Sequence, residues 1–173
     1  PIQKEDFKGI FKAMDGYPVN VRLLDPPLHE FVPHDLKGQE EMAAAMGVTV
    51  EYIKKRVESL CEHNPMLGHR GCRLGNTYPC ITQMQTRAIL GAAIELKREG
   101  FDPHPEIMVP LTGILYEFEA QEKVIRDEAA ALFAEEGMEI PFKVGTMIEI
   151  PRAALTANRI ASRAEYFSFG TND

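Results

Sequence analysis

Short, nearly all-apolar runs alternate with longer amphipathic runs along this chain, and this alternation constrains the fold more than any other feature. The apolar runs have the length of strands and lie at residues 19–24, 106–111, 143–150 and 165–169. Strands that are mostly apolar and are separated by amphipathic helices are typical of a parallel sheet covered by helices. The pattern therefore predicts an α/β fold with parallel strands.

The helices between these strands are marked by capping residues and by helical spacing. Thr49 precedes apolar residues at positions 50, 53, 57 and 60, which is typical of a capped helix. Pro79 and Gly100 bracket a long helix, and Gly137 closes another. The expected helices cover residues 5–14, 36–46, 50–62, 79–99, 115–136 and 151–161. Residues 64–74 are expected to form a glycine-punctuated turn region around a very short extended piece near residues 66–69.

Polar side chains lie at the carboxyl ends of several expected strands, namely Arg22, Asp25, Glu149 and Asp173. A closed (β/α)8 barrel builds its active site at that face from several strand ends, although an open sheet shares the same local pattern. A complete barrel takes about 250 residues, and this chain has 173. We therefore predict a partial (β/α)8 TIM barrel with strands missing at both ends, in which residues 1–173 form one segment of a single domain.

Composition and charge exclude several classes of protein. Hydrophobic residues make up 45% of the chain, which is enough for a substantial core. The net charge of −7 argues against nonspecific binding to nucleic acid or to an anionic membrane. No apolar run approaches the roughly 20 residues of a membrane span, and residues 1–6 do not resemble a signal peptide. Three cysteines without C-x-x-C spacing indicate a reducing compartment, so we expect a cytoplasmic location.

Two carboxylates, Glu149 and Asp173, each stand at the end of an expected strand. Consecutive strands of a parallel sheet lie about 4.8 Å apart, so the two side chains could share one hard cation. Mg²⁺ commonly takes one or two protein carboxylates and completes its shell with substrate oxygens and water, and Mn²⁺ could replace it. Met147, two residues before Glu149 on the same strand face, could touch a substrate.

Arginines are the candidate groups for binding a phosphoryl group bidentately. Arg22 lies within an expected strand, where it could either face the barrel mouth or pair with Asp25. Arg70 lies between two glycines in the turn region, and it is favoured over Arg73 as the residue that faces the site. Thr171 and Asn172 precede Asp173 and could present polar groups to an anion, or could belong to an ordinary turn.

The other reactive residue types are poorer candidates. His69 could act as a general acid or base, although a histidine in such a position is more often a packing residue. Cys72 and Cys80 have no recognisable base beside them, so they are not expected to be nucleophiles. The remaining histidines are scattered without the spacing of metal ligands.

Four motifs, which follow one another along the whole chain, resemble the pyruvate, phosphate dikinases within the wider family of phosphoenolpyruvate-utilising enzymes. The motifs are VRLLDPPLHEF at residues 21–31, NPMLGHRGCRL at 64–74, GTMIEIPRAA at 145–154 and FSFGTND at 167–173. The resemblance implies a phosphotransferase that interconverts ATP, phosphate and pyruvate with AMP, diphosphate and phosphoenolpyruvate. It places this chain in the middle of the barrel domain that binds phosphoenolpyruvate and pyruvate.

The resemblance also implies roles for individual residues and partners. Glu149 and Asp173 would hold Mg²⁺, Arg22 and Arg70 would hold the phosphoryl group, and Asn172 with Thr171 would bind substrate. A phosphohistidine on a separate domain would carry the phosphoryl group from an ATP-binding domain. The parent enzyme would be a homodimer that binds neither nucleic acid nor membrane, and a plastid or another organelle stays open as its location.

The family's first barrel strand and its catalytic cysteine would fall outside this sequence. We therefore expect that the chain alone does not turn over. Two other hypotheses stay open: a non-catalytic folding or dimerisation module, because an incomplete barrel exposes strand edges, and a Mg²⁺-dependent barrel lyase that acts on a pyruvate-like keto acid.

Overall fold

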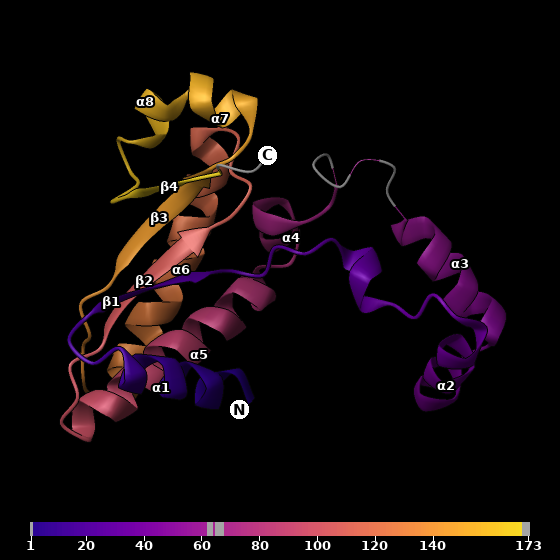
Figure 1. Cartoon of the computed structure of the whole chain (residues 1–173), viewed down its shortest axis with the longest axis horizontal. Coiled ribbons are helices and arrows are strands. Elements are labelled where there is room, and N and C mark those ends of the chain that lie inside the picture. Colours follow the sequence, from indigo (N-terminus) through magenta and orange to yellow (C-terminus); the bar gives the residue numbers. More distant parts are fainter. Residues whose placement is uncertain (1, 62–63, 65–67, 171–173) are drawn as a thin grey trace. The chain divides into compact units, whose positions relative to one another are not determined.

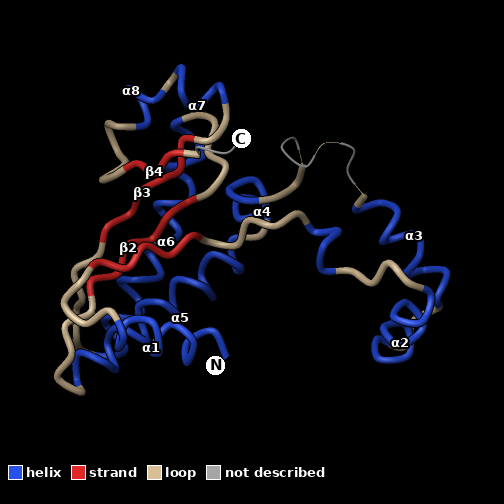
Figure 2. The backbone as a smooth tube through the Cα atoms, in the orientation of Figure 1, coloured by secondary structure: helices blue, strands red, loops and turns tan. Residues whose placement is uncertain are grey.

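The computed structural model describes residues 2–61, 64 and 68–170, and the chain divides into two compact units (Figures 1 and 2). The first unit comprises Pro1–Asp25 together with Gly71–Asp173. The second unit is the intervening segment Pro26–Arg70. The sequence showed no linker that would mark this division.

A parallel sheet of four strands forms the centre of the first unit. The strands are β1 (Pro18–Arg22), β2 (His104–Val109), β3 (Lys143–Ile148) and β4 (Phe167–Phe169), and they neighbour one another in chain order. Arg22 lies opposite Met108 on β2, and Met147 on β3 lies opposite Ser168 on β4. Figure 2 shows these strands, drawn in red, side by side. The predicted partial α/β barrel, with parallel strands alternating with helices, is confirmed.

Helices cover one face of this sheet and build the hydrophobic core against it. They are α5 (Pro79–Arg98) and α6 (Leu115–Glu136), with α1 (Ile2–Ala13) packed on α5 (Figure 1). Alternate strand residues point into this core and are almost fully buried, among them Val21, Ile107, Val109, Val144 and Ile148. Since successive side chains of a strand point to opposite faces, Arg22 and Met147 lie on the face away from these helices.

The second unit is helical. Its elements are the 3-10 helix η1 (Leu28–Phe31), α2 (Leu36–Met46) and α3 (Val50–Leu60). Asp35 caps α2 by accepting a hydrogen bond from Gly38 N, and Thr49 caps α3 by accepting one from Tyr52 N. The predicted cap at Thr49 is thus confirmed. Among the described residues, no helix of either unit is long and apolar enough to cross a membrane.

Two expectations about local structure were wrong. The turn region expected at residues 64–74 instead leads into the helix α4 (Gly71–Thr77). The short extended piece expected near residues 66–69 lies partly outside the described residues. The single helix expected over 151–161 is broken at Thr156 into α7 (Pro151–Leu155) and α8 (Ala157–Ile160). The break has a local cause, because the Thr156 hydroxyl bonds to Arg152 O at 2.9 Å and lies 3.3 Å from Gly113 O.

Candidate active site

Glu149 directly follows β3, at the carboxyl edge of the sheet. Its Oε1 atom accepts a hydrogen bond of 2.6 Å from the backbone N–H of Leu111, which lies just beyond the end of β2. The Glu149 side chain therefore leans across the neighbouring strand end while remaining half-buried. This bond fixes one oxygen of a carboxylate that the sequence singled out as a metal ligand.

The segment that donates this hydrogen bond has an unusual backbone. Leu111 has a φ of 62°, and among the described residues it is the one non-glycine residue with a positive φ. Its side chain is nevertheless buried, with 2% exposure. A bulky residue in the left-handed region costs on the order of 1–3 kcal/mol and persists only where its surroundings hold it. Such strain is concentrated at functional sites, so the strained Leu111 supports a functional site at this strand end.

Arg22 is the last residue of β1, so it lies at the carboxyl end of that strand. Its Nη1 atom lies 3.7 Å from Asp25 Oδ2 and 3.7 Å from the sulfur of Met147. The Arg22 side chain is 48% exposed, whereas Asp25 is almost fully buried. The pairing with Asp25 that the sequence suggested as an alternative is therefore present. The contact with Met147 also brings Arg22 to the strand that carries Glu149.

The other predicted site residues belong to the second unit or lie outside the described residues. Arg70 and His69 belong to the second unit, where both are half-buried and Arg70 N bonds to Gly68 O at 3.0 Å. Thr171, Asn172 and Asp173 lie outside the described residues. Across residues 2–61, 64 and 68–170, no group of three or more His, Cys, Asp or Glu side chains is placed to hold a metal ion. The roles predicted for these residues therefore stay predictions.

The placed groups fit a magnesium ion that is completed by a ligand. Mg²⁺ prefers hard oxygen donors and usually takes one or two carboxylates, with the rest of its shell from water and substrate. Glu149 supplies such a carboxylate, oriented by a hydrogen bond as metal-ligating carboxylates usually are. Arg22 supplies positive charge on the same strand face. The donor chemistry suits a metal-bound anion at this edge.

Cys72 lies at the start of α4, next to the loop between β2 and α6 that contains Leu111. Its thiol donates to Leu111 O at 3.1 Å, and its backbone N–H donates to Pro110 O at 3.0 Å. Burial, together with the nearby carboxylate of Glu117, raises the pKa of the Cys72 thiol to about 12. The thiol is therefore protonated at neutral pH, which agrees with the expectation that it is not a nucleophile. Cys80 is exposed.

The sequence did not predict that the loop between β2 and α6 contacts β3 and Glu149. The Thr146 hydroxyl, fully buried on β3, lies 2.7 Å from Val109 O and 2.8 Å from the Thr112 hydroxyl. A threonine within an otherwise apolar strand was the available signal, because a buried hydroxyl needs a partner. The left-handed turn at Leu111 gave no signal, since leucine is not a residue that favours positive φ.

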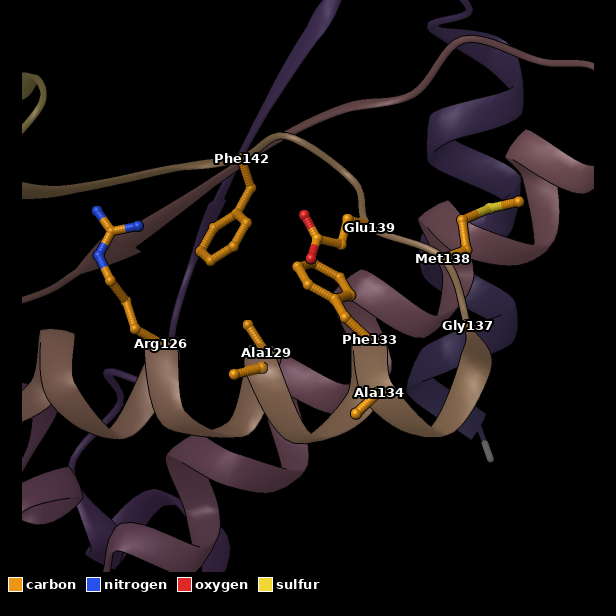
Figure 3. A pocket seen from close by; sticks show the side chains of 9 residues that line it. Arg126, Ala129, Phe133, Ala134, Gly137, Met138, Glu139 and Phe142 are labelled. Carbon is orange, nitrogen blue, oxygen red and sulfur yellow. The ribbon is translucent and has the colours of Figure 1, made fainter.

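A hollow elsewhere on the first unit does not belong to this site. Its volume is about 560 Å³, and it is lined by the C-terminal half of α6 and the segment before β3. Figure 3 shows Phe133 and Arg126 of α6 directed toward Phe142, whose ring lies 6.1 Å from that of Phe133. Phe142 precedes the first residue of β3, whereas Glu149 follows its last. The hollow is therefore at the opposite end of the strand.

Comparisons with known proteins show the family of this chain. The family model described as PEP-utilising enzyme, PEP-binding domain, matches residues 2–173. The chain is 55% identical over 174 residues to pyruvate, phosphate dikinase of Clostridium symbiosum, with all of this chain and 20% of that protein covered. It is 57% identical over 175 residues to the chloroplastic pyruvate, phosphate dikinase 1 of Arabidopsis thaliana, of which it covers 18%.

A third relative gives the same result. Pyruvate, phosphate dikinase of Giardia intestinalis is 54% identical over 173 residues, with all of this chain and 20% of that protein covered. The chain thus spans about a fifth of the length of these relatives. With a family match over residues 2–173, a polar strand edge of the expected kind and the four motifs in order, this chain belongs to the PEP-utilising enzymes, within their PEP-binding domain.

Proposed function

We propose that this chain supplies part of a Mg²⁺-dependent pyruvate and phosphoenolpyruvate site in a phosphotransferase of the pyruvate, phosphate dikinase type. The full natural protein would interconvert ATP, pyruvate and phosphate with AMP, phosphoenolpyruvate and diphosphate. A phosphohistidine on another domain would exchange its phosphoryl group at this site. Residues 1–173 would form a single segment of the barrel domain.

The observation that carries this proposal is that Arg22, the last residue of β1, contacts Met147 on β3, the strand that Glu149 directly follows. Arg22 touches Met147, and Glu149 lies two residues beyond Met147 along the chain. A guanidinium and a carboxylate on one strand face can bind a metal-bound anion from two sides. The high identity to three pyruvate, phosphate dikinases supports the proposal that this anion is pyruvate or phosphoenolpyruvate.

The side chains suggest how the site would act. Arg22 carries a permanent positive charge and planar N–H donors, so it would bind and orient a phosphoryl or carboxylate group. Its approach to Asp25 limits the directions in which the guanidinium can point. Met147 would give the substrate an apolar wall beside this charge. When bound, Mg²⁺ would supply positive charge that stabilises negative charge developing on the substrate oxygens.

Further residues enter the proposal through the family resemblance. Asp173 would share the metal with Glu149, and Asn172 and Thr171 would contact the substrate. Arg70 would contribute a second guanidinium to the phosphoryl group in transfer. The full protein would be a homodimer of the cytoplasm or of a plastid, and the chloroplastic location in the names of plant relatives supports the second alternative.

Binding of oxalate, which resembles the enolate of pyruvate, tests this proposal. Isothermal titration on the longest natural chain that contains these residues should show oxalate binding that depends on Mg²⁺. Glu149→Gln should weaken it at least tenfold, because the substitution removes the charge and one hard donor while keeping the shape. Arg22→Gln should weaken binding by a similar factor, about the 1.5–3 kcal/mol of a charged hydrogen bond.

Glu139→Gln is the matched control, because Glu139 is an exposed carboxylate outside this edge. It should bind oxalate as the native protein does. Equal oxalate affinity in the native protein and in Glu149→Gln, with both folded, would contradict the proposed site.

A further inference from the structure

The loop between β2 and α6 is held by contacts from three other segments of the first unit. Glu149 after β3 accepts the N–H of Leu111, and Thr146 within β3 lies against Thr112. Cys72 at the start of α4 donates to the carbonyls of Pro110 and Leu111 through its N–H and its thiol, respectively. Each of these contacts is made to a backbone group or a buried hydroxyl of one short segment.

The contacts to Leu111 act on both sides of the same residue. Its N–H is directed at Glu149, while its carbonyl accepts from the Cys72 thiol. With φ at 62°, Leu111 turns the chain so that these two groups have separate partners. Without its partners this residue would relax toward the favoured negative-φ regions, and the N–H would no longer be held toward the carboxylate.

The thiol approaches the loop closely because the residue before it is glycine. Gly71 has a φ of 55°. A Cβ atom there would lie 2.8 Å from the Leu111 Cβ and 3.1 Å from both Pro110 O and Asp25 Oδ1. Gly71 therefore lets α4 begin directly against the loop, and any larger residue would push α4 and its thiol away.

The donor character of the Cys72 side chain is maintained by its surroundings. The residue is 1% exposed, and its thiol also hydrogen-bonds the Thr112 side chain. The thiol lies beside a carbonyl oxygen, which can only accept, so the sulfur must supply the proton. Thr112 in turn lies 2.8 Å from Thr146 on β3, which ties the thiol, the loop and the third strand together.

We propose that Cys72 is a positioning residue for Glu149, acting through Leu111. The thiol holds the Leu111 carbonyl, the left-handed turn then directs the Leu111 N–H at Oε1, and this bond sets the orientation of the carboxylate. The inference rests on the proposed function, because it assigns a role in metal binding to a residue that does not touch the metal. Hydrogen-bond partners of a metal ligand typically change metal affinity by about 10–100-fold when removed, and Cys72 holds such a partner, the Leu111 backbone, in place.

The affinity for Mn²⁺, measured by electron paramagnetic resonance on the longest natural chain containing these residues, tests this role. Cys72→Ala removes the donor and should weaken Mn²⁺ binding about tenfold or more. Cys72→Ser keeps a donor of nearly the same shape and should restore the affinity to within about threefold of native. Cys80→Ala is the matched control at an exposed cysteine, and it should bind Mn²⁺ as the native protein does.

Comparing the two Cys72 variants in Mn²⁺ affinity and in unfolding temperature separates a positioning role from a general effect on stability. A buried serine costs stability because its hydroxyl is more polar than a thiol, so Cys72→Ser is not expected to unfold at a higher temperature than Cys72→Ala. If Mn²⁺ affinity followed stability alone, the serine variant would bind no better than the alanine variant. Recovery of affinity in the serine variant without recovery of the unfolding temperature supports the positioning role.

Glu149→Gln distinguishes a failure of this inference from a failure of the proposed function. If Glu149→Gln loses Mn²⁺ binding while Cys72→Ala keeps the native affinity, the metal site stands and the positioning role is overturned. If Glu149→Gln binds Mn²⁺ as the native protein does, the proposed metal site is wrong and the inference is overturned with it.

Discussion

The backbone N–H of Leu111 and the Oε1 atom of Glu149 are joined by a hydrogen bond of 2.6 Å that links the ends of two adjacent strands. Leu111 makes this bond from a left-handed backbone conformation, with φ at 62°. A conformation that costs free energy is thus maintained beside the carboxylate that the sequence assigns to metal binding. This arrangement is held by β3 and by the start of α4, through Glu149 and Cys72.

Gly71→Ala should destabilise the 173-residue chain by about 2–4 kcal/mol. The new Cβ would approach Leu111 Cβ to 2.8 Å, and the backbone there has a positive φ. Gly9→Ala is the matched control, because a Cβ at Gly9 in α1 meets nothing within 4 Å. That change should stabilise α1 by about 0.5–1 kcal/mol. Urea denaturation measures both, and equal effects would show that α4 does not press on the loop as described.

Stability should fall at alkaline pH partly through Cys72. Burial raises the pKa of its thiol from 9.0 to about 12 in the folded chain. As pH rises, the thiol loses its proton in the unfolded chain before it does so in the folded chain. The contribution of Cys72 to the free energy of unfolding is therefore complete below about pH 9 and is lost as pH rises toward 12. The pKa of Tyr166 is also raised by burial and acts in the same direction. In Cys72→Ala, the free energy of unfolding, measured by urea denaturation, should change less with pH between pH 9 and 11 than it does in the native chain.

Alkylation provides an independent check on the same thiol. At pH 8, Cys61 and Cys80 are exposed and should react quickly with iodoacetamide, whereas Cys72 should react only after unfolding. Rapid modification of all three cysteines in the folded chain would be incompatible with the buried position of Cys72.

Much of this fold was predictable because the relevant signals are local. The apolar run at residues 143–150 became β3, with bounds Lys143–Ile148, and Gly137 closes α6 as its position suggested. The placement of Arg22 and Glu149 at strand ends also follows from counting along apolar runs. Hydrophobic periodicity and capping are properties of short segments, so one sequence is enough to read them.

Features that depend on distant contacts were not predictable. Helix α4 contains Gly71 and Gly75, which in sequence indicate a turn. Gly75 is required instead by packing, since a Cβ there would clash with Gln121 Oε1 on α6. The left-handed turn at Leu111 likewise depends on partners from β3 and α4. The division at residues 26 and 70 carries no compositional signal of a linker.

Glu122 should be important for stability although it lies far from the candidate site. Its carboxylate is 6% exposed and binds Arg126 at 2.9 Å and Arg163 at 3.1 Å. Glu122→Ala should cost about 1.5–3 kcal/mol, since both arginines are partly exposed and can be rehydrated. Glu119→Ala, which removes an exposed carboxylate 4.0 Å from Arg163, should cost under about 0.5 kcal/mol. Similar losses in the two variants by urea denaturation would contradict this assignment.

Gly145 and Tyr166 should show strong energetic coupling. A Cβ at Gly145 would lie 2.6 Å from two ring carbons of Tyr166 and from its carbonyl oxygen. Gly145→Ala should therefore destabilise the chain by about 1–3 kcal/mol through overpacking. Truncating the ring removes part of that clash, so the double variant with Tyr166→Ala should be more stable than the sum of the single effects predicts. Additive effects in a double-mutant cycle would show that the ring does not press on β3.

Glu149 and Arg22 are proposed to bind one metal-bound anion at the carboxyl edge of the sheet. The most direct test is a crystal structure of the longest natural chain containing these residues, grown with Mn²⁺ and oxalate and measured at a wavelength where manganese scatters anomalously. The account predicts an anomalous peak in direct contact with the Glu149 carboxylate, with oxalate bound between this ion and the Arg22 guanidinium. An ordered Mn²⁺–oxalate pair at another site, with Glu149 touching neither, would contradict it.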